Sequence, residues 1–501
     1  MTGPVLFQNV RLLQADADRG ISNSTDVLTA NGTIAAIGST LQPPEQARVI
    51  NGGGNLLMPG LVNAHFHSSV THMRGRLPCL PLEIFMLYES PALDVLTPTP
   101  REAYLRTMLG CLEMLRTGTT SVGDDCFFVP APTPEIIDAV CQAYADSGMR
   151  ATVAIDEPEL SEVEKLPFLG DLIPHDLRKH LARRPAFDGA KLLGLYQHLI
   201  SKWHDTHDGR IRAAVSCSAP QRVTPQYFAE LDDLSKKHDL AFFAHMLETK
   251  LQRVLGDEKF GGRSLVRYTH DLGLLSERML IIHAIWVDDA DLDLIAASGA
   301  PVAHNPISNV RLGSGVMPFC AIRDRGIPIC LGVDEAIADD AINMWSVMKT
   351  AGMIHTLSSH DYTQWPAAQE ILTCGTQTGG AALRIPRLGT LCLGAPADLI
   401  LVDLSTLAFL PLNDTVRQLV HVELGQSVRL TMVAGRVVFE SGEVISVDEQ
   451  VLMDEARDLF GTKHAALEAA EQEIASRLPF YEQMYRRAAT RDVGLRRRLD
   501  S

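Results

Sequence analysis

Hydrophobic and polar positions follow two alternating rhythms along the middle of the chain, from about Gly60 to about Pro386. Eight short, mostly apolar runs alternate with longer amphipathic segments such as residues 101–118. Apolar runs are typical of strands buried on both faces, and the periodicity between them is typical of helices. Repeated strand–helix units predict an α/β fold, and eight of them favour a closed (β/α)8 barrel, with an open doubly wound sheet as the alternative. The predicted strands are "GLVNAHFH", "TTSVGDDC", "RATVAI", "IRAAVSCS", "LAFFAHMLE", "MLIIHAIW", "PVAHNP" and "PICLGVDE".

Both ends of the chain have a different sequence pattern, which predicts short strands separated by turns such as Asn31-Gly32 and Ser441-Gly442. We therefore predict a small β-sandwich domain formed by residues 1–58 together with residues 388–446, flanking a barrel at residues 59–387. Residues 447–501 form a predicted helical extension, expected as one long helix that ends in a solvated "GLRRRLD".

A long connection follows the first predicted strand. Residues 68–100 contain prolines and aromatic residues in "RGRLPCLPLEIFMLYESP" and exceed an ordinary strand-to-helix loop. Because this segment leaves the strand at the expected active-site face, we predict that it forms a lid.

Composition narrows the function classes. The chain has 501 residues, of which 46% are hydrophobic and 21% charged, and a formal charge of -16. A strongly acidic protein is a poor match for nucleic acid or an anionic membrane, since phosphate binding requires a basic surface. The N-terminus lacks a signal-peptide pattern, and no apolar stretch could span a bilayer. Nine scattered cysteines without a C-x-x-C pair favour the reducing cytoplasm.

Potential metal ligands stand at the ends of the predicted strands. Successive side chains alternate faces in a strand, so His65 and His67 project to the same side. A single histidine in an apolar strand is usually a core residue, but here several strand ends hold a histidine or a carboxylate, and these ends converge on one face of a barrel. Such a nitrogen and oxygen donor set predicts a Zn²⁺ site, with Fe²⁺ or Mn²⁺ as alternatives. The residues are His65, His67, His245, His283, His304 and Asp334.

Five motifs, "PGLVNAHFH", "HMLE", "IIHAIW", "HNPISNVRLGSG" and "LGVDE", resemble in order those of the amidohydrolase superfamily. The branch most similar to the chain is the triazine hydrolase and aminohydrolase group, which includes cytosine, guanine and S-adenosylhomocysteine deaminases. The resemblance covers nearly the whole chain. It implies that one divalent ion is bound by four residues, which are His65, His67, His245 and Asp334. Binuclear relatives use a carboxylated lysine from strand three or four, and these strands contain no lysine here.

The resemblance also implies roles for Glu248, as the proton shuttle, and for His283, beside the metal-bound water. A divalent ion lowers the pKa of bound water toward neutrality, which provides a hydroxide nucleophile. Asp334 would take the first proton, and Glu248 would deliver a proton to a ring nitrogen and later to the leaving amine. His283 would hydrogen-bond the hydroxide or the oxyanion that develops.

Candidate substrate contacts come from the lid and from the ends of strands four and seven. Arg74 could meet a carboxylate or a polar ring edge, and Phe85 or Tyr88 could stack on a flat ligand. Ser218 occupies a position where relatives that deaminate S-adenosylhomocysteine tend to have histidine, which weakens the case for an adenosine-containing substrate. The full candidate set is Arg74, Gln221, His304, Asn305, Phe85 and Tyr88, beside Arg76 and Asn309.

The predicted function is a hydrolase that acts on C–N bonds other than peptide bonds. We expect an aminohydrolase that releases ammonia from an amino-substituted pyrimidine, purine, pterin or triazine. One alternative is a triazine-type chlorohydrolase or N-alkylaminohydrolase, or a cyclic-amide hydrolase, and another is a non-catalytic barrel that serves in assembly. The expected partners are a small heterocyclic substrate and further copies of the chain, without nucleic acid or membrane.

Overall fold

The computed structural model describes residues 3–14, 16–89, 97–129, 131–185 and 187–498. Residues 90–96, which belong to the predicted lid, lie outside the described residues.

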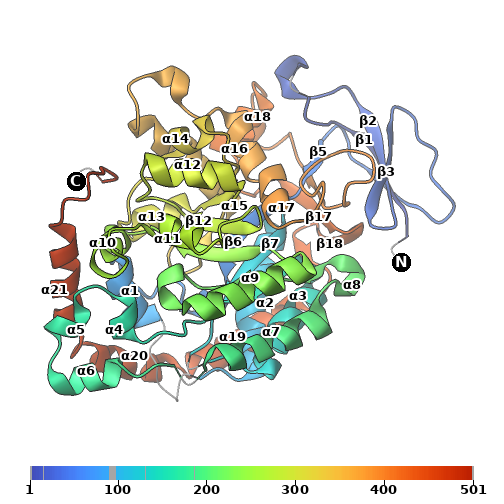
Figure 1. The fold of residues 1–501 in the computed structure, drawn as a ribbon. Coiled ribbons are helices and arrows are strands. Elements are labelled where there is room, and N and C mark those ends of the chain that lie inside the picture. Colours follow the sequence, from blue (N-terminus) through green and yellow to red (C-terminus); the bar gives the residue numbers. More distant parts are fainter. Residues whose placement is uncertain (1–2, 15, 90–96, 130, 186, 499–501) are drawn as a thin grey trace.

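The centre of the molecule is an eight-stranded parallel barrel, as the sequence predicts (Figure 1). Two strands are interrupted: β9 continues into β10, and β14 continues into β15. Between β9 and β10, Ala214 donates its N–H to Val153 on one side, and Val215 bonds Ala241 on the other. β15 pairs with β6, which closes the barrel. In chain order the strands are β6 (Leu61–His67), β7 (Thr119–Cys126), β8 (Arg150–Ile155), β9 (Ile211–Ala213), β10 (Val215–Ser216), β11 (Phe242–Met246), β12 (Met279–His283), β13 (Val302–His304), β14 (Ile329–Leu331) and β15 (Asp334–Glu335).

Apolar residues on both faces of these strands explain their continuous hydrophobicity. In β12, Leu280 and Ile282 belong to a cluster inside the barrel, while Met279 and Ile281 pack outward against the helices. The principal helices outside the barrel are α2 (Pro100–Arg116), α3 (Pro134–Ser147), α7 (Gly189–Trp203), α9 (Pro225–His238), α10 (Lys250–Lys259), α11 (Leu265–Asp271), α12 (Asp289–Ser298), α14 (Phe319–Asp324), α15 (Met344–Ile354), α16 (Ala368–Cys374), α17 (Gln377–Ala382) and α18 (Thr415–His421).

Shorter elements occupy the connections. They are α1 (Leu82–Glu89), α4 (Glu162–Lys165), α5 (Leu169–Leu172), α6 (His175–Leu181), α8 (Thr206–Gly209), α13 (Pro306–Arg311) and the 3-10 turns η1 (Asp18–Gly20), η2 (Ser68–Met73), η4 (Pro220–Arg222), η5 (His355–Leu357), η6 (Tyr362–Gln364) and η7 (Leu407–Phe409). In the part of the chain that the structure describes, no helix has the length and apolar character needed to cross a bilayer.

Both ends of the chain contribute strands to two further sheets beside the barrel (Figure 1). One sheet has the order β3-β2-β1-β4 and the other β19-β18-β17-β16-β5. Phe7 and Val27 of the first sheet share an apolar cluster with Leu57, Leu399 and Met432 of the second. The boundaries at residues 58, 387 and 446 remain predictions. The strands are β1 (Val5–Val10), β2 (Thr25–Ala30), β3 (Thr33–Gly38), β4 (Arg48–Asn51), β5 (Leu56–Pro59), β16 (Leu399–Val402), β17 (Val428–Val433), β18 (Arg436–Glu440) and β19 (Glu443–Val444).

The C-terminal region contains three helices, so the expectation of one long helix is wrong. They are α19 (Glu449–Gly461), α20 (His464–Ile474) and α21 (Leu478–Ala489). Gly461 favours the end of α19, and Pro479 fits only the first turn of a helix, where its missing N–H costs nothing. The "GLRRRLD" end is also not simply solvated, because Arg497 donates to the carbonyls of Ile285 and Val287, each at 2.8 Å.

Candidate metal centre

An irregularity in β6 aims the two histidines of the first motif into the barrel. Val62 and Ala64 lie in the inner apolar cluster, so strict alternation would turn residue 66 inward as well. The register shifts between Asn63 and Phe66, and Phe66 instead packs outward against α2. A bulge of this kind redirects side chains. As a result His65 and His67 both face the barrel interior, with ring centroids 4.7 Å apart.

The structure brings the four predicted ligands together. One nitrogen or oxygen atom from each of His65, His67, His245 and Asp334 lies within 4.8 Å of the others, and all four residues are buried. Asp334 Oδ1 is 3.1 Å from His65 Nε2 and 3.5 Å from His67 Nε2. The Nε2 atoms of His65 and His245 are 3.2 Å apart. Tetrahedral ligands roughly 2.1 Å from a zinc ion are about 3.4 Å from one another, so the donors fit such an ion.

Backbone carbonyls orient two of these imidazoles. His67 Nδ1 lies 2.5 Å from the Asp125 carbonyl, and His245 Nδ1 lies 2.7 Å from the Ser218 carbonyl. Nδ1 must donate in both contacts, which leaves each Nε2 with a free lone pair toward the cluster. A second potential cation group consists of Asp125, Asp156 and His245. However, the His245 nitrogen nearest Asp125 is Nδ1, which already donates to the Ser218 carbonyl.

Burial and charge set the protonation of the three histidines. Burial lowers the pKa of His65 to about 4 and holds the pKa of His245 well below its usual value. Burial opposes protonation of His67 too, but the hydrogen bond and charge of Asp334, with the charges of Asp156 and Asp125, raise its pKa to about 10. Because a ligating imidazole must be neutral at the coordinating nitrogen, a cation at this cluster would compete with a proton on His67.

Two further groups complete an acid–base site beside the cluster. His283 Nε2 lies 3.5 Å from Glu248 Oε2 and 4.0 Å from Asp334 Oδ2. Burial raises the pKa of Glu248 to about 7, with the charges of Asp334 and Glu83 adding to the shift. A carboxyl group that exchanges its proton near neutrality, next to an imidazole, is suited to proton transfer.

One short segment after β13, residues 308–314, forms hydrogen bonds to Asp334, Glu248 and His283. Ser308 Oγ donates to Asp334 Oδ2 at 2.5 Å, and Ser314 Oγ donates to Glu248 Oε1 at 3.3 Å. Between them, Asn309 Oδ1 lies 2.9 Å from His283 Nδ1. Sequence reasoning missed Ser308 and Ser314 and considered Asn309 as a candidate near the pocket or equally as a turn cap, although all three lie in "HNPISNVRLGSG".

The backbone is strained at several of these strand ends. Ser218, His283 and Asp334 have φ angles of 58°, 75° and 74°, in the left-handed region that side chains with a Cβ rarely adopt. Such conformations cost about 1–3 kcal/mol each and cluster at functional sites. Their coincidence with the group of predicted ligands supports a functional role for this face of the barrel.

Gly332 permits the close approach of strand eight to the cluster. A Cβ at this position would lie 2.4 Å from Asn305 Oδ1 and 2.9 Å from His65 Cβ. Any side chain here would therefore have to displace His65, a predicted ligand, or its neighbour Asn305.

The candidates from the ends of strands four and seven are buried. Gln221 Oε1 and Asn305 Oδ1 have no hydrogen-bond partner among the described residues. Asn305 Nδ2 lies 3.4 Å from His283 Nδ1. His304 Nε2 lies 2.9 Å from His355 Nε2 in η5, so this ring is engaged with another histidine. Their roles as substrate contacts remain predictions.

The candidate residues of the predicted lid differ in how far their side chains are buried. Phe85 is buried in an apolar cluster with Val70 and Met73, and Tyr88 is half-buried beside it. Arg74 is exposed and forms an ion pair with Glu113 at 2.5 Å, and Arg76 pairs with Glu471. The structure thus shows these arginines bonded to other carboxylates, and a substrate role for Arg74, Phe85 or Tyr88 remains a prediction.

The amino-acid sequence is similar to those of known proteins. The Amidohydrolase family matches residues 56–438. A 5-methylthioadenosine/S-adenosylhomocysteine deaminase from Nitratidesulfovibrio vulgaris is 34% identical over 466 residues, covering 92% of this chain and 98% of the relative. A 5'-deoxyadenosine deaminase from Methanosarcina barkeri is 30% identical over 454 residues, covering 90% and 96% of the two chains.

Solved structures show the same fold. An adenosine deaminase from Xanthomonas campestris with bound zinc superimposes with a TM-score of 0.78 at 26% identity, covering 91% of this chain and 98% of the other. The atrazine chlorohydrolase from Arthrobacter aurescens, complexed with zinc, gives a TM-score of 0.81 at 23% identity, covering 91% and 100%.

Proposed function

This chain belongs to the amidohydrolase family, and on that premise we propose that it is a metal-dependent aminohydrolase that removes the amino group of an adenine-type ring and releases ammonia. The buried group of His65, His67, His245 and Asp334, with Glu248 and His283 beside it, is the observation on which this proposal depends. A barrel that served only in assembly would have no need of six buried polar residues in this arrangement.

Zinc is the proposed ion, held by the three imidazoles and Asp334. Three nitrogen donors and one carboxylate suit zinc, and two similar structures contain it. When bound, a divalent ion supplies Lewis acidity that brings the pKa of a coordinated water toward neutrality.

The chain's own residues then manage the protons. Asp334 Oδ2, which already accepts a hydrogen bond from Ser308, would accept a proton released at the attacking oxygen. Glu248 would deliver a proton to a ring nitrogen, which makes the attacked carbon more electrophilic, and would later protonate the departing amine. His283, whose Nδ1 donates to Asn309, would accept a hydrogen bond from the attacking oxygen at Nε2 and so orient it.

The relatives support the adenine-type substrate. The most similar curated proteins reported above are named for adenosine derivatives, and they are matched over almost their full length. Ser218, where relatives that deaminate S-adenosylhomocysteine tend to have histidine, is the one residue that weighs against such a substrate. Since the Ser218 side chain accepts a hydrogen bond from Arg222 at 3.0 Å, that position can serve another local arrangement without histidine.

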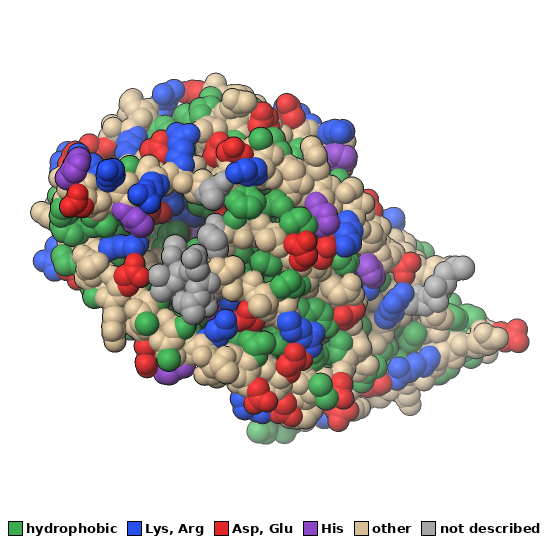
Figure 2. Space-filling view, turned by 90° about the horizontal axis from the view of Figure 1, so that it is seen from below, with side chains coloured by type: hydrophobic (Ala, Val, Ile, Leu, Met, Phe, Trp, Pro, Cys, Tyr) green, Lys and Arg blue, Asp and Glu red, His purple; other side chains and the backbone are tan. Residues whose placement is uncertain are grey.

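Location and assembly are also proposals. All nine cysteines are free and six of them are buried, which suits a reducing compartment such as the cytoplasm. The face shown in Figure 2 mixes acidic and basic side chains, which supports a small-molecule substrate in preference to nucleic acid. A homo-oligomer is proposed from the family resemblance.

Ammonia release tests the function. Zinc-loaded protein is offered adenosine, 5'-deoxyadenosine, 5-methylthioadenosine, guanine, cytosine and an aminated triazine, with metal content measured in parallel. For adenosine, 5'-deoxyadenosine and 5-methylthioadenosine we expect one ammonia and one hydroxylated ring for each molecule of substrate consumed. Chloride or alkylamine release from triazines without deamination of any ring would favour the alternative hydrolase, and protein that binds no divalent ion would contradict the proposal.

A further inference from the structure

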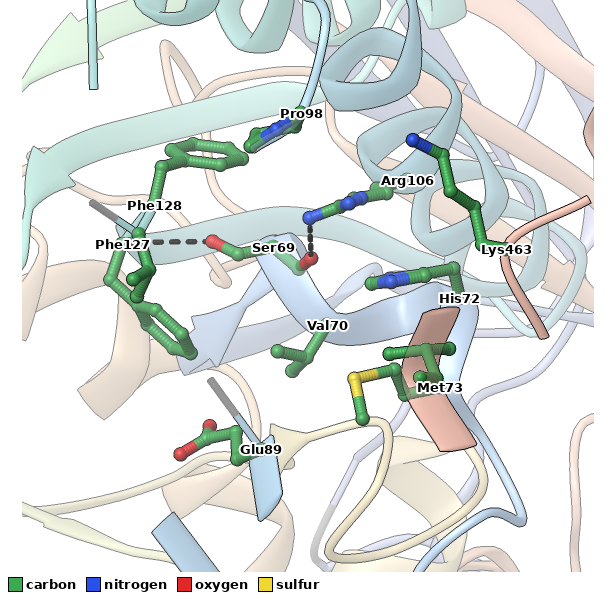
Figure 3. Close-up of a pocket in the computed structure, with 12 residues that line it drawn as sticks. Ser69, Val70, His72, Met73, Glu89, Pro98, Arg106, Phe127, Phe128 and Lys463 are labelled. Carbon is green, nitrogen blue, oxygen red and sulfur yellow. Dashed lines mark hydrogen bonds between the residues drawn. The ribbon is translucent and has the colours of Figure 1, made fainter. Parts of the chain in front are cut away.

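The C-terminal region contacts the barrel at two places. In the first, shown in Figure 3, Lys463 at the start of α20 lies next to His72 of η2 and Arg106 of α2, beside a cavity of about 50 Å³. The second contact is made by residues 490–498, which follow α21 and which we call the C-terminal tail. The tail reaches the connections that follow β12 and β13, and these connections carry groups of the candidate metal centre.

Arg497 of the C-terminal tail is bonded to both connections at once. Its guanidinium donates from Nε to the Ile285 carbonyl and from Nη2 to the Val287 carbonyl, each at 2.8 Å. The planar fork of an arginine side chain suits two carbonyls at a fixed spacing. The backbone carbonyl of Arg497 accepts the N–H of Val316, also at 2.8 Å. A single tail residue therefore joins the loop after β12 to the connection after β13.

The stretch from Gly313 to Val316 depends on outside support, because its backbone has little stiffness of its own. Gly313 and Gly315 have φ angles of 60° and 128°, which glycine adopts without strain. The tail supplies two hydrogen bonds here, from Arg498 Nη1 to the Gly313 carbonyl at 2.7 Å and from Val316 N to the Arg497 carbonyl. The approach is close, since a Cβ on Gly315 would lie 2.8 Å from the Arg497 carbonyl oxygen.

Ser314 lies in the middle of this stretch and contacts the acid–base site. Its buried hydroxyl donates to Glu248 Oε1 at 3.3 Å. The Ser314 carbonyl accepts the indole N–H of Trp286 at 2.8 Å, and Trp286 belongs to the loop whose neighbouring carbonyls Arg497 binds. The backbone N–H of Trp286 also donates to the carbonyl of Leu247, which precedes Glu248. A continuous set of hydrogen bonds thus connects the tail with Glu248.

We propose that Arg497 is a positioning residue of the deamination reaction, which holds the Gly313–Val316 stretch so that the Ser314 hydroxyl stays on Glu248. This inference rests on the proposed function, in which Glu248 transfers protons. Because Oε1 accepts the Ser314 hydroxyl, the exchangeable proton is favoured on Oε2, which lies 3.5 Å from His283 Nε2. The tail thereby orients the acid without touching the substrate.

A double-mutant cycle tests whether Arg497 acts through Ser314. Ammonia release from adenosine is measured for zinc-loaded wild type, Arg497→Ala, Ser314→Ala and the double variant. We expect each single substitution to lower kcat about 10- to 100-fold, with little change in KM or bound metal. The double variant should match Ser314→Ala, since residues that act as one unit are not additive. Losses that multiply, or a loss in Arg497→Ala confined to KM, would overturn the proposal.

Arg496→Ala is the matched control. Arg496 precedes Arg497 in the tail and its side chain is exposed, so this variant should retain the wild-type kcat. Arg497→Lys keeps the positive charge but replaces the planar fork with a single donor group, so it should retain more activity than Arg497→Ala. It also takes the place of Arg497→Ala in the cycle if that variant does not fold. An equal loss of kcat in Arg496→Ala and Arg497→Ala would contradict the specific role of Arg497.

Hydrogen exchange tests the support of the stretch without catalysis. The backbone amides of residues 313–317 are followed in metal-loaded wild type, Arg497→Ala and Arg496→Ala. We expect about 10-fold faster exchange in Arg497→Ala alone, the factor that corresponds to loss of roughly one hydrogen bond. Equal exchange in all three proteins would overturn the proposal. If no ring compound yields ammonia, the proposed function fails, whereas the exchange rates still decide whether Arg497 holds the stretch.

Discussion

Asn309 Oδ1 lies 2.9 Å from His283 Nδ1, so the amide oxygen accepts the proton on that ring nitrogen. His283 is therefore protonated at Nδ1 and presents the lone pair of Nε2 to Glu248 and Asp334. Nε2 lies 3.5 Å from Glu248 Oε2, so the two groups are close enough to share a proton directly or through a bridging water. The tautomer of the histidine is thus fixed by a residue outside the group of potential ligands.

Replacing Asn309 tests this arrangement. In Asn309→Ala, Nδ1 loses its acceptor and the ring can adopt the other tautomer or turn away. We expect kcat to fall roughly 10- to 100-fold, as for other residues that orient a catalytic histidine, with bound metal unchanged. Steady-state kinetics and metal analysis measure both. Asn309→Asp retains an oxygen acceptor and should preserve more activity than Asn309→Ala, and the reverse order would contradict the tautomer argument.

Glu248→Gln separates proton transfer from metal binding. Glu248 is outside the group of four donors, and its replacement preserves shape while removing the exchangeable proton. We expect metal content to remain at the wild-type level and kcat to fall about 10²- to 10⁴-fold, the usual contribution of a general acid–base residue. Normal turnover with normal metal content would exclude Glu248 from the mechanism.

The buried Glu248 carboxyl also makes stability depend on pH. Its folded-state pKa is raised to about 7 from 4.5 by burial, so the folded protein binds the proton more tightly than the unfolded chain. Stability from this group is therefore complete below pH 4.5 and is lost as the pH rises through 7. In metal-free protein, Glu248→Gln should unfold at a higher temperature than wild type above pH 7, by about 3 kcal/mol in free energy, with the difference vanishing near pH 4.5. A difference that does not vary with pH would show that the carboxyl is not perturbed.

The strand pattern was sufficient to predict the barrel and a gathering of histidines and a carboxylate at one end of it, for a physical reason, whereas the choice of four donors among them came from the family resemblance. Strands buried on both faces must be apolar throughout, so a histidine or aspartate at the end of such a strand is conspicuous, and barrel geometry makes those ends converge. Each of the eight predicted runs contains an observed strand or an interrupted pair, as β14 and β15 show for "PICLGVDE".

The remaining details depended on contacts between distant residues. Nothing in "GLVNAHFH" indicates the register shift after Asn63 that turns Phe66 outward, because it arises from pairing with β7 and packing on α2. His304 was considered as a substrate contact, yet its ring meets His355, 51 residues later in the chain.

Gly332 provides the last test, of how tightly the barrel constrains the predicted metal ligands. An added Cβ would meet Asn305 Oδ1 at 2.4 Å and His65 Cβ at 2.9 Å, and both neighbours are buried and cannot move far. We expect Gly332→Ala to lower zinc affinity about 10- to 100-fold and the free energy of unfolding by roughly 1–3 kcal/mol, because overpacking shifts His65 from its position. Competition with a chelator and denaturant unfolding measure the two effects.

Gly194→Ala is the matched control for that substitution. Gly194 lies within α7, and a Cβ there would have no heavy atom within 4 Å. Alanine has the higher helix propensity, so this variant should be as stable as wild type or more stable by up to about 1 kcal/mol, with unchanged zinc affinity. Equal zinc affinity in Gly332→Ala and Gly194→Ala would mean that His65 tolerates displacement, and the donor arrangement at the end of β6 would then be less critical than its geometry indicates.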